Sequence, residues 1–271
     1  MPELPEVETT RRGISPHIVR QAVTMVVVRN HRLRWPIDKD LPKLLQGKTL
    51  LDIRRRGKYL LLQFEHGTVL WHLGMSGSLR IVDSAEATNT HDHVDVVFRN
   101  HKVLRYHDPR RFGSVIWTAE KLEHHPLLSH LGPEPLSEDF NGEYLFLRAR
   151  KRTQAIKTWI MDSSIVVGVG NIYANESLFN AGIHPIKAAG KVTRSHYTML
   201  AEEIKKVLTK AIERGGTTLR DFVGGDGKPG YFAQELNVYG RAGRPCVKCQ
   251  KKLLEKRLGQ RTTVYCTQCQ G

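Results

Sequence analysis

The first ten residues, MPELPEVETT, place a secondary amine beside carboxylates. A small second residue permits removal of the initiator Met, and Pro2 would then carry a free amine with a pKa of about 8, partly unprotonated and nucleophilic near neutrality. Its addition to a sugar's anomeric carbon ends in an iminium that acts as an electron sink, and Glu3 is a natural acid or base for that step. The ordinary alternative is that Glu3, Glu6 and Glu8 favour the dipole of a helix start.

The four cysteines of the chain form two C-x2-C pairs, Cys246 with Cys249 and Cys266 with Cys269, separated by sixteen residues. This spacing is typical of a structural zinc site, because four thiolates leave no coordination position open for chemistry. Zinc would then supply the folding free energy of a C-terminal ribbon that is too small to bury a core of its own. Two disulfides are the alternative, but one clustered quartet without a secretory signal favours zinc.

The chain of 271 residues carries 42 Lys and Arg against 27 Asp and Glu, which gives a formal net charge of +15. This surplus favours a polyanionic partner through phosphate contacts and counterion release, and nucleic acid is the first candidate. A membrane surface would attract the same charge, but no apolar stretch is long enough to span a bilayer and no basic helix has a broad apolar face. The acidic start is unlike a signal peptide, so we expect a cytoplasmic protein without a membrane partner.

Two clusters of cations lie beside predicted strand ends, RRRGK at residues 54–58 and DPRRFG at residues 108–113. Taken singly, a solvated face explains each cluster. An Arg-Arg-Phe tip after an Asp-Pro turn, however, combines phosphate-binding guanidinium groups with an aromatic wedge of the kind that separates stacked bases. Met75 lies in a glycine-flanked turn, where a flexible apolar side chain suits the same role, although an isolated Met more often fills a gap in a core.

Short β-rich runs separated by turn signals dominate the first part of the chain, and this pattern predicts a sandwich or barrel. The runs cover residues 22–28, 49–53, 59–64, 69–72, 94–98, 103–106 and 114–117. A short helix precedes them, with Pro5 in its first turn and Leu4, Val7 and Ile14 on one face.

Helical periods replace the β pattern from about residue 118, with residues 132–135 as a boundary. Residues 192–214 predict a helix whose apolar stripe ends at a glycine pair. The segment GVGNIYANE predicts a turn feeding a helix with Asn171 as its N-cap, where backbone N–H groups suit a phosphate, although an ordinary capped helix gives the same pattern. Residues 215–232 are glycine-rich and aperiodic, which is typical of a binding loop or of a disordered connector.

Five segments, together with the cysteine quartet, resemble the bacterial formamidopyrimidine-DNA glycosylase family over the whole chain. They are MPELPEVET at 1–9, RRGKYL at 55–60, DPRRFG at 108–113, GVGNIYA at 168–174 and LGQRTT at 258–263. The resemblance implies an α+β multidomain protein with DNA held in a cleft between its halves. Its implied parts are an N-terminal catalytic β-sandwich (1–131) bearing the catalytic helix, a helix-two-turn-helix domain (132–238) with a lesion-capping loop (215–232), and a C-terminal four-cysteine zinc-finger β-hairpin (239–271).

The same resemblance implies an enzyme of base-excision repair, a bifunctional DNA glycosylase and AP lyase. Such an enzyme removes oxidised purines, 8-oxoguanine and formamidopyrimidines, from duplex DNA and then cuts the strand by β and δ eliminations. The implied partner is double-stranded DNA containing oxidised purines or abasic sites, and the implied cofactor is one structural zinc ion. We expect a monomer, since an asymmetric set of DNA contacts needs no symmetric partner.

Carried over by position, the resemblance makes Pro2 the nucleophile, Glu3 its acid/base partner and Lys58 a phosphate contact that assists catalysis, with Glu6 supporting the N-terminal geometry. The void-filling and wedge positions match Met75, Arg110 and Phe112. Further DNA-contacting positions match His91, Asn171, Tyr239 and Arg261, and the zinc ligands would be Cys246, Cys249, Cys266 and Cys269.

Two alternatives remain beside this interpretation. An endonuclease VIII-like enzyme of the same superfamily would act on oxidised pyrimidines, and its N-terminus typically reads Pro-Glu-Gly-Pro-Glu. Here Leu4 takes the place of that glycine and the Arg-Arg-Phe tip is present, and both features favour the purine-lesion branch. The second alternative is a non-catalytic DNA-binding module that senses damage, and charge alone does not exclude it.

Overall fold

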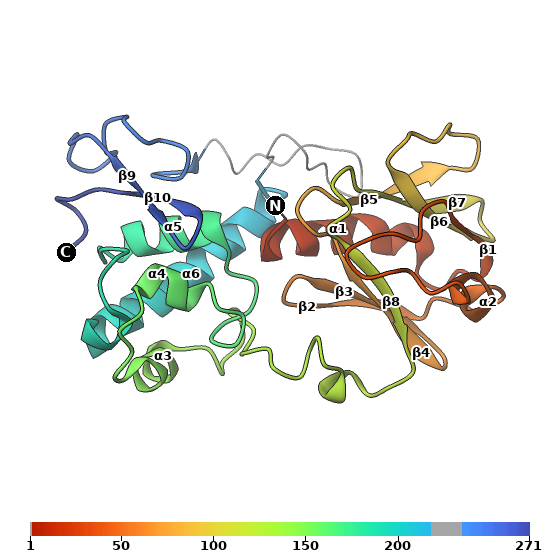
Figure 1. The fold of residues 1–271 in the computed structure, drawn as a ribbon, viewed down its shortest axis with the longest axis horizontal. Coiled ribbons are helices and arrows are strands. Elements are labelled where there is room, and N and C mark those ends of the chain that lie inside the picture. The colour runs from red at the N-terminus through yellow and green to blue at the C-terminus, as the bar shows by residue number, and fades with distance from the viewer. Residues whose placement is uncertain (1, 218–234) are drawn as a thin grey trace. The chain divides into compact units, whose positions relative to one another are not determined.

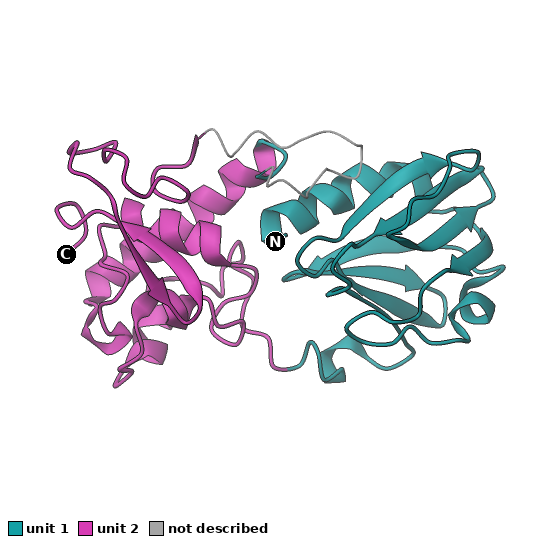
Figure 2. Ribbon diagram, turned by 45° about the horizontal axis from the view of Figure 1, so that its top comes forward, with its two compact units in different colours: residues 1–129, 214–233 teal, residues 130–213, 234–271 magenta. Residues whose placement is uncertain are grey.

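The structure is a computed structural model that describes residues 2–217 and 235–271. The chain forms two compact units, residues 1–129 with 214–233 and residues 130–213 with 234–271 (Figure 2). The predicted lesion-capping loop 215–232 lies outside the described residues except for residues 215–217.

The first unit is a β-sandwich of two antiparallel four-stranded sheets (Figure 1). The strand order is β1-β6-β7-β5 in one sheet and β2-β3-β4-β8 in the other. The strands are β1 (Val23–Val28), β2 (Asp52–Arg56), β3 (Tyr59–Phe64), β4 (Gly67–His72), β5 (Ser78–Asp83), β6 (Asp92–Phe98), β7 (Lys102–His107) and β8 (Ser114–Thr118). A short helix α2 (Leu41–Leu45) and a 3-10 helix η1 (Leu122–His124) also belong to this unit.

Buried side chains from both sheets and from the first helix form one apolar core, which includes Val7, Leu60, Trp71, Val96 and Leu104. Such a core is close-packed and resists local shifts. It confirms the predicted sandwich and gives the strand ends a rigid base.

Two strands differ from the sequence expectation. β5 falls outside the predicted runs, and β2 covers Asp52–Arg56 instead of residues 49–53. Both strands lie at the edge of their sheet. An edge strand pairs on one side only and tolerates charged residues such as Arg54 and Arg80, so its apolar pattern is weak.

Helix α1 (Leu4–Ile18) begins where the sequence predicts a helix, and its apolar residues Leu4, Val7 and Ile14 are buried. At its start, the Glu6 carboxylate accepts a hydrogen bond of 2.8 Å from the backbone N–H of Glu3. This bond satisfies a donor that a helix start leaves without an intrahelical partner. The local sequence therefore fixes the conformation of the residues that follow Pro2.

Glu8 ties α1 to strand β2. Its carboxylate accepts hydrogen bonds from Arg11 at 2.8 Å, from Arg12 at 2.9 Å and from Arg55 of β2 at 3.2 Å. Burial by itself raises the pKa of Glu8, but the hydrogen bonds from Arg11 and Arg12 and the charges of Arg11 and Arg55 outweigh it and lower the pKa to about 2.

Replacement of this carboxylate should cost stability in a pH-dependent way. Because its pKa lies below the ordinary value of 4.5, ionised Glu8 stabilises the fold fully above about pH 4.5 and progressively less as the pH falls toward 2. We expect Glu8→Gln to lower the free energy of unfolding at pH 7 by about 1–2 kcal/mol, a figure that allows for solvent screening of the arginines. Urea titrations between pH 3.5 and pH 7 should show this deficit shrinking toward the acid end.

The matched control is Glu65→Gln, since the Glu65 side chain is 72% exposed. It should change the free energy of unfolding little at any of these pH values. A deficit for Glu8→Gln that stayed constant from pH 7 to pH 3.5 would contradict the role of the ionised Glu8.

The second unit is mainly helical and contains a two-stranded ribbon near its C-terminus (Figure 1). Its elements are α3 (Gly142–Ala149), α4 (Ile156–Ile160), α5 (Asn171–Asn180), η2 (Ala189–Lys191), α6 (Arg194–Glu213), β9 (Leu254–Leu258) and β10 (Arg261–Tyr265). Helix α6 confirms the helix predicted over residues 192–214. The prediction of Asn171 as an N-cap is wrong by one position, because Gly170 itself adopts the extended conformation of the N-cap and Asn171 is the first helical residue.

The cysteine ribbon shares a small core with α5. Phe179 of α5 packs with Val238, Leu253 and Val264 of the C-terminal segment. The ribbon therefore belongs to the same compact unit as the helices, and the domain boundaries 1–131, 132–238 and 239–271 stay predictions. Within the described residues, no helix combines the length and the apolar character that crossing a bilayer requires.

Candidate active site and metal centre

Three turns leave the sheet β2-β3-β4-β8 at the same end. Tyr59 of β3 pairs with His72 of β4, and His72 pairs with Ser114 of β8. The segments next to these paired residues are the turn of Gly57 and Lys58, the turn 73–77 with Met75, and the loop 108–113. The register therefore brings Lys58, the predicted phosphate contact, and both predicted wedge segments to the same end of the sheet.

The second sheet contributes to the same end of the sandwich. His107 of β7 pairs with Ser78 of β5 and with Asp92 of β6. Ser78 directly follows the turn 73–77 and His107 directly precedes the loop 108–113, so these pairs lie beside the turns of the first sheet. His91, the residue before β6, is exposed at this end.

Contacts along α1 give the direction of the helix. Just beyond the end of the helix, the Arg20 N–H donates a hydrogen bond to the Leu50 carbonyl. Nearer its start, Arg11 donates to the Ile53 carbonyl, and Glu8 accepts from Arg55. The partners advance along β2 toward Lys58 as the helix is followed to its start. Pro2 and Glu3 therefore lie toward the Lys58 end of the sheet, and both residues are buried.

Asp108 joins the two wedge segments. Its carboxylate accepts hydrogen bonds from the Ser76 hydroxyl at 2.9 Å, from the Tyr106 hydroxyl at 3.0 Å and from the Gly113 N–H at 2.9 Å. Gly74 passes so close that a Cβ there would lie 2.5 Å from the Gly113 nitrogen. Asp108 enters the sequence pattern only as part of an Asp-Pro turn, and nothing in the sequence marks it as a buried acceptor of three bonds.

The tips of these joined segments expose apolar side chains. Phe112 is 43% exposed and Met75 is 36% exposed, whereas Ser76, Asp108 and Gly113, which anchor the same segments, are buried. The Arg110 guanidinium lies 5.2 Å from the centre of the Phe112 ring, and Arg111 between them has a positive φ of 55°. Large apolar groups held rigidly in solvent indicate a binding role more than a structural one.

His72 bonds to the Met75 turn and lies within the electrostatic influence of Lys58. Burial, followed by the charges of Lys58 and Arg34, lowers the pKa of His72 to about 4, so the ring is neutral at pH 7. Its Nδ1 accepts a hydrogen bond of 3.0 Å from the Gly74 N–H, which leaves the ring proton on Nε2. His72 was not predicted as a site residue, because a His at a strand end carries no signal of its own.

Glu6 links the start of α1 to a distant segment of the same unit. One carboxylate oxygen accepts from Glu3 as described, and the other accepts a hydrogen bond of 2.8 Å from the Thr217 N–H. Gly216 has a φ of 83° and approaches Glu6 closely, which favours glycine at this position. These contacts agree with a supporting role for Glu6, and they place residues 216–217 against the start of α1.

In the second unit, the predicted DNA contacts lie on three segments. Asn171 opens α5, and its Oδ1 has no hydrogen-bond partner among the described residues. Arg261 is exposed and follows the two-residue turn of Gly259 and Gln260, whose φ values of 51° and 64° are those of a tight hairpin. Tyr239 is half-buried, and its backbone N–H donates to the Glu176 carboxylate at 2.8 Å.

The four cysteine sulfurs converge in the ribbon, where all lie within 4.8 Å of one another. The sulfur of Cys246 is 3.9 Å from that of Cys269, and the sulfur of Cys249 is 3.4 Å from that of Cys266. A tetrahedral site with Zn–S bonds of about 2.3 Å separates its sulfurs by about 3.8 Å. The quartet therefore fits a single metal ion, and the Lys248 N–H supports it with a 3.4 Å contact to the Cys246 sulfur.

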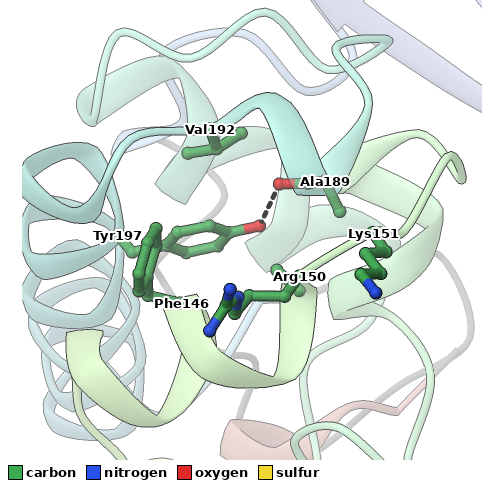
Figure 3. A pocket seen from close by; sticks show the side chains of 8 residues that line it. Phe146, Arg150, Lys151, Ala189, Val192 and Tyr197 are labelled. Carbon is green, nitrogen blue, oxygen red and sulfur yellow. Dashed lines mark hydrogen bonds between the residues drawn. The ribbon is translucent and has the colours of Figure 1, made fainter.

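A hollow of about 170 Å³ lies elsewhere in the second unit (Figure 3). Its lining residues are Phe146, Ala149, Arg150, Lys151, Ala189, Gly190, Val192 and Tyr197. The Tyr197 hydroxyl donates to the Ala189 carbonyl at 2.8 Å. No predicted site residue lines this hollow, so it does not mark the candidate site.

Two family profiles match the chain. The formamidopyrimidine-DNA glycosylase N-terminal domain matches residues 1–115, and the formamidopyrimidine-DNA glycosylase H2TH domain matches residues 131–223. The first match covers the sandwich up to the start of β8, with both wedge segments, and the second covers α3 to α6. The match to the second profile confirms the predicted helix-two-turn-helix part.

Relatives match along their whole length. The formamidopyrimidine-DNA glycosylase of Saccharophagus degradans is 66% identical, with 100% of each chain covered. The crystal structure of the MutM (Fpg) protein from Thermus thermophilus has a TM-score of 0.89 and 37% identity over 100% of this chain and 99% of that one. Lactococcus lactis Fpg, solved with DNA containing N7-benzyl-Fapy-dG, has a TM-score of 0.92 and 34% identity over 99% of both chains. This chain therefore belongs to the formamidopyrimidine-DNA glycosylase family.

Proposed function

We propose that the protein is a bifunctional base-excision repair enzyme, which removes 8-oxoguanine and formamidopyrimidines from duplex DNA and then cleaves the strand as an AP lyase. The observation that carries this proposal is the arrival of the α1 start, Lys58 and the two wedge segments at one end of the sandwich. Two solved complexes support the substrate class: a mutant of Lactococcus lactis Fpg with Fapy-dG DNA, and Lactococcus lactis Fpg with DNA containing an abasic site.

The first chemical step is base removal. With Met1 absent, the Pro2 nitrogen forms a bond to C1′ of the damaged nucleotide, and the base leaves with the electrons of the glycosidic bond and takes up the proton that the Pro2 nitrogen loses. The sugar ring then opens as the Pro2 nitrogen lone pair forms the iminium, and O4′ gains a proton. Glu3 is buried and adjacent to Pro2, so it is suited to deliver that proton.

The second step is strand cleavage. The iminium withdraws electrons from the sugar, so a proton leaves C2′ and the 3′ phosphate departs in the β elimination. Loss of a further proton from C4′ expels the 5′ phosphate in the δ elimination, and water then releases Pro2. The Lys58 ammonium would stabilise a phosphate near the lesion through a charge-assisted contact.

The remaining residues would hold the DNA. Met75, Arg110 and Phe112 are suited to fill the gap left by an extruded nucleotide. Asn171 and Arg261 would contact backbone phosphates, and His91 and Tyr239 would make further contacts to the DNA. The net charge of +15 favours binding to the phosphate backbone. Cys246, Cys249, Cys266 and Cys269 would hold one zinc ion, whose role is structural. We further propose a cytoplasmic monomer.

Covalent trapping tests this proposal. Protein whose mass shows that it begins at Pro2 is incubated with an 8-oxoguanine duplex and borohydride, which reduces an iminium to a stable amine. We expect one protein–DNA adduct at the N-terminal peptide. Binding without an adduct would instead indicate a non-catalytic damage sensor, and preferential trapping on an oxidised-pyrimidine duplex would indicate an endonuclease VIII-like enzyme.

A further inference from the structure

The turn before Arg261, formed by Gly259 and Gln260, is loosely packed where it faces α4. A cavity of about 250 Å³ lies between this turn and α4. Its lining residues are Lys157, Thr158, Met161, Asp162, Leu258, Gly259 and Arg261. The nearest approach of Gly259 is an ordinary contact, since a Cβ there would lie 3.6 Å from the Thr158 methyl group. Close packing at the turn therefore does not explain how Arg261 keeps its place.

The residues directly after Arg261 are held by hydrogen bonds from two helices. The Lys157 ammonium of α4 donates to the Thr262 carbonyl at 2.8 Å and to the Thr263 hydroxyl at 2.7 Å. The next residue, Val264, donates its N–H to the Asn175 side chain of α5 at 2.9 Å. Three consecutive residues of β10 are thus bound to α4 and α5.

Lys157 is the unusual member of this set, because its side chain is fully buried. A buried ammonium is expensive unless it is well hydrogen-bonded, and lysine is rarely found in such a place. A charged donor also forms stronger hydrogen bonds than a neutral one. A lysine that directs its charge to a backbone carbonyl and a hydroxyl of one strand fixes that strand more firmly than an apolar residue would.

Asn175 completes the arrangement. Its Nδ2 donates to the Asn171 carbonyl at 2.6 Å while its Oδ1 accepts from Val264. The first turn of α5, which carries Asn171, and the strand that carries Arg261 are therefore held by one side chain. Lys157 binds the same strand at Thr262 and Thr263, which lie between Arg261 and Val264.

We propose that Lys157 is a positioning residue for DNA binding, which acts by holding the start of β10 so that Arg261 is presented to a backbone phosphate. This inference rests on the proposed role of Arg261. According to this inference, part of the DNA affinity that Arg261 contributes at the surface depends on the buried Lys157 behind the hairpin.

A double-mutant cycle tests the inference. Lys157→Met, Arg261→Ala and the double variant are titrated with a duplex containing a stable abasic-site analogue, at several salt concentrations. We expect Lys157→Met and Arg261→Ala each to weaken binding by about 10-fold, and each to lower the slope of log affinity against log salt by about 0.9, which corresponds to one phosphate contact. The double variant should bind no more weakly than Arg261→Ala alone.

Lys43→Met is the matched control, because it removes the same charge from a side chain that is 85% exposed. It should leave the affinity close to that of the unchanged protein. Zinc content and the thermal midpoint are measured for every variant, so that unfolding of the ribbon is distinguished from a shift of the hairpin.

Thr263→Val keeps the test decisive if Lys157→Met fails to fold or loses zinc. It removes one acceptor of the ammonium and retains the lysine, and we expect a smaller affinity loss in the same direction with zinc retained. Unchanged affinity and salt slope in a folded Lys157→Met or Thr263→Val protein would overturn the inference, as would losses that multiply in the double variant. Unchanged binding by Arg261→Ala would instead refute the proposed role of Arg261.

Discussion

Protein that retains Met1 should bind an 8-oxoguanine duplex but should neither cut it nor form a borohydride-trapped adduct. In that form the Pro2 nitrogen belongs to a peptide bond, and its lone pair is delocalised into the carbonyl. An amide nitrogen cannot add to C1′, so the covalent path is closed. We expect strand cleavage to fall by at least about 10³-fold, in line with the loss of an essential nucleophile in other covalent enzymes.

The two forms can be compared within one preparation. Protein produced while methionine aminopeptidase is inhibited retains Met1, and later digestion with that enzyme exposes Pro2 without any change of sequence elsewhere. Cleavage and trapping should return together with the mass loss of one Met, whereas the affinity for the duplex should change little. Full cleavage by protein that intact-mass analysis shows to carry Met1 would exclude Pro2 as the nucleophile.

The sequence predictions that the structure confirms rest on patterns among residues close together in the sequence. The spacing of Cys246, Cys249, Cys266 and Cys269 predicted a common site, and their sulfurs do converge. The α6 stripe and the central strands were also predictable, because a buried face imposes its period on the sequence. Strands β2 and β5 carry charged residues such as Arg54 and Arg80, which weaken that pattern, so one strand was misplaced and the other was missed.

Contacts between distant segments could not be predicted in the same way. Lys157 and Thr262 are 105 residues apart, and Glu6 and Thr217 are 211 residues apart. The sequence around one residue of such a pair does not indicate its partner. A Lys in an apolar run and a Glu in a first helical turn are both common without any distant contact. Resemblance to a family marks the side chains that face a ligand, whereas the buried residues behind them emerge only from the fold.

Loss of the metal should weaken DNA binding even though the metal would lie in a structural site. Among the described residues, the apolar side chains Leu253 and Val264 of the ribbon pack with Val238 and Phe179. At roughly 1.5–3 kcal/mol each, they cannot offset the ordering of a ribbon whose residues each cost about 1–2 kcal/mol of backbone entropy. Metal–thiolate bonds, worth roughly 10–16 kcal/mol in small zinc-folded peptides, are the larger stabilising contribution.

We therefore expect Cys249→Ser to lose most bound zinc and to bind the abasic-site duplex about 10- to 100-fold more weakly, since Arg261 and its phosphate contact depend on the ordered ribbon. Metal analysis and a binding titration on the same sample check both effects. Chelation of the unchanged protein should reproduce them, and added zinc should reverse them. Arg261→Ala separates the two causes, because it should weaken binding while zinc stays bound. Metal-free protein that kept full affinity would show that the ribbon does not hold DNA.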